Sequence, residues 1–161
     1  MQAVELPSAT SALPVRAILL DTNIVLDLFV FNDPATPALL QALQGGSLRW
    51  IASQPMRDEL ERVLAYTHIV PRLAFYQLSA ADVLQRFDAM VQIVDVAPKV
   101  QLTCKDPDDQ KFIDLAVAHQ AVLLSKDHAV LALAKRMRPF GVQAQKELAS
   151  AEISQARPSL Q

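Results

Sequence analysis

Glycine and cysteine are scarce in this sequence of 161 residues, and each scarcity excludes a class of site. Only 3 glycines occur, at Gly45, Gly46 and Gly141, so the chain lacks the glycine-rich loops with which many nucleotide-binding folds cradle phosphates. The single cysteine, Cys104, excludes an intramolecular disulfide and a zinc cluster built on cysteines. No histidine stands beside it in a recognisable pattern, so we expect it to pack rather than act as a nucleophile. A reducing, cytoplasmic setting is expected.

Long apolar runs and an excess of positive charge are also missing. No run approaches the roughly 18 residues of a membrane span, and the first residues carry no signal-peptide core, so we expect no membrane partner. The net charge is -2, from 15 basic and 17 acidic residues. Overall charge therefore does not favour a polyanion, and contact with nucleic acid requires local basic groups and neutralised acids.

Short apolar segments alternate with amphipathic ones, which predicts an α/β fold. Strands are expected at residues 17–21, 47–53, 91–96, 121–125 and 140–144. Helices are expected at residues 23–31, 36–44, 53–66, 79–90, 106–120 and 126–137, with Thr36, Ser53 and Ser79 as N-caps. This order predicts a three-layer α/β/α sandwich with a central parallel sheet of about four or five strands.

The composition suits one domain, since 52% of the residues are hydrophobic and can bury a substantial core. We expect residues 17–147 to form it. The proline-rich residues 1–16 are expected to be a flexible leader, and the polar residues 148–161 a flexible tail.

Four acidic side chains are expected to lie near one edge of the sheet. Asp21 ends the first predicted strand and Asp127 comes two residues after a later one, and ligands of parallel sheets bind where strands end. Glu59 borders the apolar stripe of its helix, and Asp109 shares a stripe with core residues of its own helix. All four side chains could therefore point toward one place.

Each acid also has a simpler explanation. Asp21 and Asp127 could cap helices, Asp109 could favour a helix N-terminus by about 0.3–1 kcal/mol, and Glu59 could pair with a neighbouring arginine. Together they are harder to explain, because two carboxylates 4–5 Å apart repel by roughly 3–4 kcal/mol at an effective dielectric constant near 20. A cluster must take up protons or a cation, and carboxylates without cysteine or histidine favour Mg²⁺ or Mn²⁺.

Three stretches carry a resemblance to a known family: "ILLDTNIVLDL", "ASQPMRDELERVL" and "CKDPDDQKFIDLAVAHQAVLLSKDHAVL". In order and spacing they resemble PIN-domain ribonucleases, in the branch of VapC-like toxin components of toxin–antitoxin systems. The resemblance implies that Asp21, Glu59, Asp109 and Asp127 are the catalytic and metal-binding acids, supported through hydrogen bonds by Asn23 and Ser125. It leaves open whether Asp106 joins them.

The same resemblance implies cofactors and partners. The cofactor would be Mg²⁺ or Mn²⁺ and the substrate RNA. The protein partners would be a small antitoxin protein and a second copy of the chain in a homodimer.

Basic and aromatic residues near these stretches have two interpretations. Arg57, Arg62, Lys105, Lys111 and Lys126 could form a phosphate-binding rim or simply be solvated helix charges. Trp50 lies in a predicted strand, so core packing or an interface is favoured over base stacking.

Three other classes of protein are alternatives. A haloacid-dehalogenase-type phosphatase needs a second Asp two residues after the first, where this chain has Asn23. A receiver domain needs an acidic pair at the first strand, which "LLDTN" lacks. A PIN-fold module that binds RNA or protein without catalysis stays open, and binding unchanged in Asp21→Asn would favour it.

Overall fold

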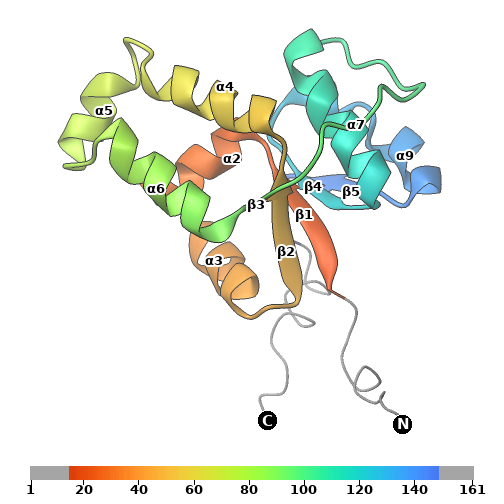
Figure 1. Ribbon diagram of the computed structural model, residues 1–161, viewed down its shortest axis with the longest axis horizontal. Coiled ribbons are helices and arrows are strands. Elements are labelled where there is room, and N and C mark those ends of the chain that lie inside the picture. Colours follow the sequence, from red (N-terminus) through yellow and green to blue (C-terminus); the bar gives the residue numbers. More distant parts are fainter. Residues whose placement is uncertain (1–14, 149–161) are drawn as a thin grey trace, which may run out of the picture.

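A parallel sheet of five strands organises the structure, a computed structural model that describes residues 15–148. The strands are β1 (Arg16–Leu20), β2 (Leu48–Ala52), β3 (Gln92–Ile93), β4 (Val122–Leu124) and β5 (Gln143–Gln145). They lie in the order β3-β2-β1-β4-β5 (Figure 1), and every neighbouring pair is parallel. The predicted parallel sheet is confirmed.

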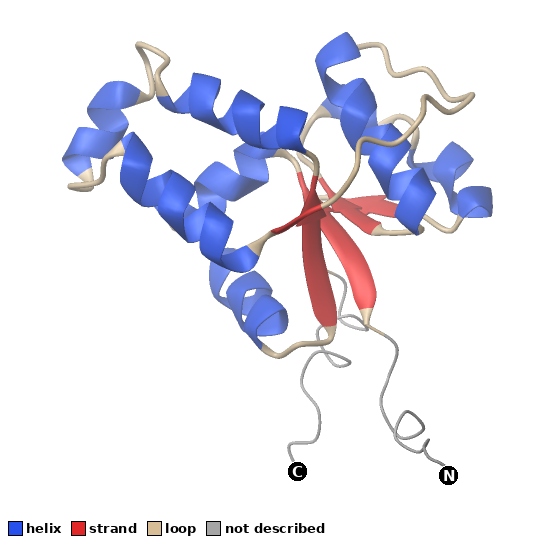
Figure 2. Ribbon diagram, viewed as in Figure 1, coloured by secondary structure: helices blue, strands red, loops and turns tan. Residues whose placement is uncertain are grey.

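Helices cover both faces of this sheet. They are α2 (Thr22–Leu26), α3 (Thr36–Gln44), α4 (Gln54–Leu64), α5 (Val70–Phe75), α6 (Ala80–Met90), α7 (Gln110–His119), α8 (His128–Leu131) and α9 (Ala134–Met137). In Figures 1 and 2, α2, α3 and α6 lie on one side of the sheet, and α7 and α9 lie on the other. The predicted α/β/α sandwich is therefore also confirmed. Within residues 15–148 no helix is long and apolar enough to cross a bilayer.

The core forms because the central strands are mostly apolar and are covered on both faces. Ile18, Ile51 and Leu123 are all 0% exposed. Trp50 packs between Phe29 and Phe87, with ring centroids 5.9 and 5.3 Å away. Its role is core packing, as the sequence favoured. Cys104 is likewise buried, and that burial raises the pKa of its thiol.

The predicted helix starts agree with the structure at the two helices that a serine precedes. Ser53 is the N-cap of α4, and Ser79 is the N-cap of α6. Asp82 completes a capping box: its backbone N–H donates to Ser79 Oγ at 3.1 Å and its carboxylate accepts from Ser79 N–H at 2.9 Å. The prediction of Thr36 as an N-cap was wrong. Thr36 is the first residue of α3, and its hydroxyl donates to the Asp27 carbonyl at 3.0 Å.

Three elements before residue 100 differ from expectation. The helix predicted at 23–31 begins as α2 but continues as a π-helix, η2 (Asp27–Phe31), and ends where Asn32 adopts a left-handed φ of 54°. Helix α5 lies in a stretch for which no element was predicted. Strand β3 is shorter than the predicted 91–96, because it is an exposed edge strand that pairs only with the last two residues of β2.

Two elements near the end also differ. The helix predicted at 126–137 is split into α8 and α9, since Leu133 N–H bonds to the Val130 carbonyl three residues back and tightens the turn there. The last strand, predicted at 140–144, begins only at Gln143. A 3₁₀ turn, η4 (Arg138–Phe140), precedes it, and Gly141 follows with a φ of 83° that glycine adopts without steric cost.

The ends of the chain bear on the domain boundaries. Arg16 begins β1, so the first strand starts one residue inside the predicted leader. Most of that leader and almost all of the predicted tail lie outside the described residues.

The order of the strands creates a switch point beside β1. From β1 the chain passes outward to β2 and β3, and it then returns through α7 to β4 on the other side of β1. Ligands of open α/β sheets bind at the carboxyl ends of strands where the order reverses in this way. Leu20 pairs with Leu124 in the register of β1 and β4, so the residues directly after these two strands face one crevice.

An exposed ion pair joins α4 to α6. Arg57 Nε and Nη2 donate to the two Asp88 carboxylate oxygens at 2.7 and 2.8 Å, with side-chain exposures of 24% and 47%. We expect Arg57→Ala to lower the free energy of unfolding by less than about 1 kcal/mol, because water and salt screen exposed pairs. Urea unfolding at low and high salt measures it, with Asp88→Asn and the double variant as controls. Strictly additive effects of the two single changes would contradict a stabilising pair.

Candidate metal centre

Asp21 stands directly after β1 and is held from two sides. Its Oδ1 accepts from the Thr22 backbone N–H at 2.7 Å, which caps α2, and its Oδ2 accepts from Ser125 Oγ at 2.6 Å. The side chain is only 4% exposed. Burial raises the pKa of Asp21, the hydrogen bonds from Ser125 and Thr22 lower it, and the charges on Glu59 and Asp127 raise it again, with a net increase. The predicted helix cap is therefore real, but it leaves a carboxylate in a costly environment.

Ser125 links the ends of β1 and β4. While its hydroxyl donates to Asp21, the same oxygen accepts from the Asp127 backbone N–H at 3.0 Å. Asp127 in turn caps α8, where its Oδ1 accepts from the Ala129 N–H at 2.8 Å. One fully buried hydroxyl thus sets the positions of two acids that are far apart in the sequence.

Asp109 reaches the same place from the other side. It ends a short 3₁₀ turn, η3 (Pro107–Asp109), immediately before α7, and it is 5% exposed. Its Oδ2 is buried and has no hydrogen-bond partner. Burial, hydrogen bonding with Asp127 and the charges on Asp21, Asp127 and Asp106 raise the pKa of Asp109 to about 8. A buried carboxylate oxygen without a partner costs free energy unless a proton or a cation meets it.

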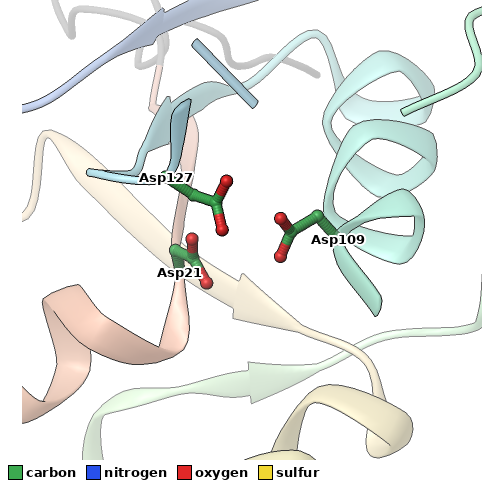
Figure 3. A group of neighbouring side chains, drawn as sticks. All are labelled: Asp21, Asp109 and Asp127. Atoms are coloured by element: carbon green, nitrogen blue, oxygen red, sulfur yellow. The ribbon is translucent and has the colours of Figure 1, made fainter. Parts of the chain in front are cut away.

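The three aspartates converge. One ligand atom from each of Asp21, Asp109 and Asp127 lies within 4.8 Å of the others, and Figure 3 shows the carboxylates pointing toward one another. Charges this close repel strongly when the side chains are buried, as those of Asp21 and Asp109 are. The cluster offers only hard oxygen donors, together with the unpartnered oxygen of Asp109. These residues therefore fit a divalent cation such as Mg²⁺ or Mn²⁺.

Glu59 lies beside this cluster, not within the group of three. Its Oε2 accepts from Thr22 Oγ1 at 2.6 Å, and its Oε1 pairs with Lys111 Nζ at 2.5 Å. Both oxygens are thus engaged by the protein, although Glu59 lines the same pocket as the aspartates. Sequence analysis predicted the acid but neither of its partners, since nothing local in the sequence brings residue 22 or residue 111 to residue 59.

Asn23 and Asp106 border the same pocket, a cavity of about 340 Å³. Asn23 is exposed, and its side chain makes no hydrogen bond within residues 15–148. Asp106 caps η3, where its Oδ1 accepts from the Asp108 N–H at 3.0 Å. Asp106 therefore acts as the cap of this turn, and its charge also acts on Asp109.

Three of the five basic residues predicted for a possible phosphate rim are held in ion pairs with acids of the protein. Lys126 pairs with Asp27 at 2.6 Å and with Asp33 at 3.1 Å. Lys111 pairs with Glu59, and Arg57 with Asp88. Arg62 lines the pocket.

The fold and site define an α/β protein whose clustered carboxylates suit a divalent cation at the carboxyl edge of a parallel sheet. Comparison with protein-family models agrees with this: a model of the PIN domain matches residues 17–129. The chain therefore belongs to the PIN domain family, a nuclease superfamily. A search of the curated proteins returned no match. The membership disfavours the phosphatase and receiver-domain alternatives.

Proposed function

We propose that this PIN domain is a divalent-metal-dependent endoribonuclease that hydrolyses RNA phosphodiester bonds, and that it is the toxin component of a toxin–antitoxin system. One observation carries the enzymatic part. Three aspartates from separate segments converge within 4.8 Å, and one of them keeps a buried, unpartnered oxygen. Such an arrangement is costly for stability alone, and a bound cation relieves the cost.

The proposed mechanism assigns a task to each side chain. Asp21, Asp109 and Asp127 would hold the cation, while Ser125 keeps Asp21 and Asp127 in place. A cation bound there would supply Lewis-acid chemistry, activating water and stabilising charge on a phosphodiester. Glu59 is proposed as the fourth acid of the pocket, oriented by Thr22 and Lys111. Asn23 is proposed to support the pocket from its exposed rim.

The proposed partners rest on the family resemblance. They are an RNA substrate, a small antitoxin protein that blocks the acidic pocket, and a second copy of the chain. We also propose that the protein acts in the cytoplasm. Light scattering of the purified chain tests the homodimer.

The enzymatic proposal is tested by cleavage. We expect the wild type to cut members of a set of single-stranded and structured RNAs with Mn²⁺ or Mg²⁺, and not with EDTA. Asp21→Asn should lower the rate at least about 100-fold, because changing even a residue that only supports a metal ligand typically costs 10- to 100-fold. Gel electrophoresis of end-labelled RNA measures the products.

The matched control is Asp95→Asn, which removes the same charge from an exposed residue that does not line the pocket. It should cut like the wild type. Folded wild-type protein that cuts none of these RNAs with either metal would refute the proposal for these substrates. Binding of RNA that is unchanged by Asp21→Asn and by EDTA would then support the non-catalytic binding module.

A further inference from the structure

Among the described residues, Arg62 is a basic side chain that lines the acidic pocket, and Lys111 beside the pocket is already paired with Glu59. The acids that line it are Asp21, Glu59, Asp106, Asp108, Asp109 and Asp127. A phosphodiester that enters this pocket meets strong negative charge, which one divalent cation offsets only in part. A cation supplied by the protein at the pocket wall therefore has an electrostatic task that the aspartate cluster cannot perform.

Arg62 belongs to a row of residues on one face of α4 that extends away from the aspartate cluster. Glu59, Arg62, Val63 and Tyr66 follow one another at helical spacing and all line the pocket. This row continues past the end of α4, because the Tyr66 N–H donates to the Val63 carbonyl at 3.0 Å and prolongs the helical turn. The wall thus presents an acid, a base and an aromatic ring in that order.

Both outer residues are available to a ligand. Arg62 is exposed, and its guanidinium has no ion pair or hydrogen bond within residues 15–148, unlike Arg57 and Lys111. Tyr66 is 46% exposed. Its ring leans against His68, with centroids 5.6 Å apart, which limits its orientation.

We propose that Arg62 and Tyr66 form a binding site for single-stranded nucleic acid. Arg62 contacts a phosphate next to the one at the aspartate cluster, and Tyr66 stacks on the base of a neighbouring nucleotide. Single strands offer an unpaired base whose face is free to stack, whereas a duplex keeps its bases stacked on one another. This inference deepens the proposed nuclease function and rests on it for the position of the scissile phosphate.

The test measures binding separately from cleavage. A labelled oligonucleotide of eight or so nucleotides, made as RNA and as DNA and carrying one 2-aminopurine, is titrated with the full chain in the Asp21→Asn background. Tyr66→Ala should weaken binding about 5- to 100-fold and abolish quenching of 2-aminopurine, while Tyr66→Phe should retain both. Arg62→Gln should weaken binding and reduce the slope of log K against log salt by about 0.7.

Two exposed residues outside the pocket provide matched controls. Tyr76→Ala removes a tyrosine that is 41% exposed, and Arg136→Gln removes an arginine on α9; neither lines the pocket. Both should bind the oligonucleotide like the parent.

The outcomes separate this inference from the proposed function. Losses specific to Tyr66→Ala and Arg62→Gln support the binding site even if the wild type cuts no RNA, in which case only the nuclease proposal fails. Cleavage by the wild type with unchanged binding in both variants would overturn the inference and leave the nuclease intact. The inference would also be overturned if Tyr66→Ala and Arg62→Gln weakened binding to a blunt duplex of the same sequence as much as they weakened binding to the single strand.

Discussion

Asp109→Asn is expected to weaken metal binding strongly and, at the same time, to stabilise the metal-free protein. The wild-type side chain is 5% exposed, lies among other acids and has a buried oxygen without a partner. An amide of nearly the same shape removes the charge that burial and its neighbours disfavour. Above pH 8, where the wild-type acid is ionised, we expect a gain of roughly 1–3 kcal/mol. The same change removes one of three proposed ligands, so metal affinity should fall at least about 100-fold.

Urea unfolding in EDTA and calorimetric titration with Mn²⁺ measure the two effects. Asp114→Asn is the matched control, because it makes the same substitution at a buried acid of α7. Asp114 is satisfied there: its Oδ1 accepts from the Val100 N–H at 3.1 Å and from Gln110 Nε2 at 2.8 Å. It should therefore gain no stability and leave metal binding intact. A metal-free Asp109→Asn protein less stable than the wild type would show that the carboxylate has a structural partner.

The metal-free protein is expected to lose stability as the pH rises from about 5 to 8. The folded-state pKa of Asp109 is about 8, above its ordinary value of 3.8, so the folded protein keeps a proton that the unfolded chain releases. Stability from this group is complete below the unfolded pKa, declines as pH rises, and levels off above pH 8. The slope is at most about 1.4 kcal/mol per pH unit for one group. Asp21, whose pKa is also raised, acts in the same direction.

Acids whose pKa values are lowered by folding do not change the stability between pH 5 and 8. Backbone or side-chain hydrogen bonds lower the pKa values of Asp33, Asp82 and Asp88, so their contribution is present above the unfolded value near 4 and declines only below it. Urea unfolding in EDTA at intervals from pH 5 to 8 measures the effect. Saturating Mn²⁺ should remove the decline, and Asp109→Asn should flatten it. Stability in EDTA that stays constant or rises over this range would contradict the raised pKa.

Local patterns in the sequence were sufficient for the central architecture. Ile18 and Leu123 belong to short apolar runs, and such runs alternating with amphipathic helices imply a covered parallel sheet. Ser53 and Ser79 predicted the starts of two helices correctly, because an N-cap is a local interaction. The edges were less predictable: β3 and β5 depend on pairing with a neighbour strand, and the break between α8 and α9 depends on one tightened turn.

Some residues of the candidate site could likewise be predicted from local patterns, and others could not. Asp21 and Asp127 were predictable because each follows a strand, and the ends of parallel strands share an edge. Lys126 was not, because its partners Asp27 and Asp33 lie about a hundred residues earlier in the chain. Tyr66 has a local signal in the sequence, because it follows Glu59 by about two helical turns.

The sequence by itself determined the fold class, the order of the motifs and the acids available to a metal centre, because these follow from periodicity and from residue chemistry at strand ends. Only the tertiary structure decided which acids meet. It brings together Asp21, Asp109 and Asp127, and it engages Glu59 with Thr22 and Lys111. The reason is physical: the pKa of a carboxylate depends on burial and on charges a few ångströms away, and these distances are set by how strands and helices pack.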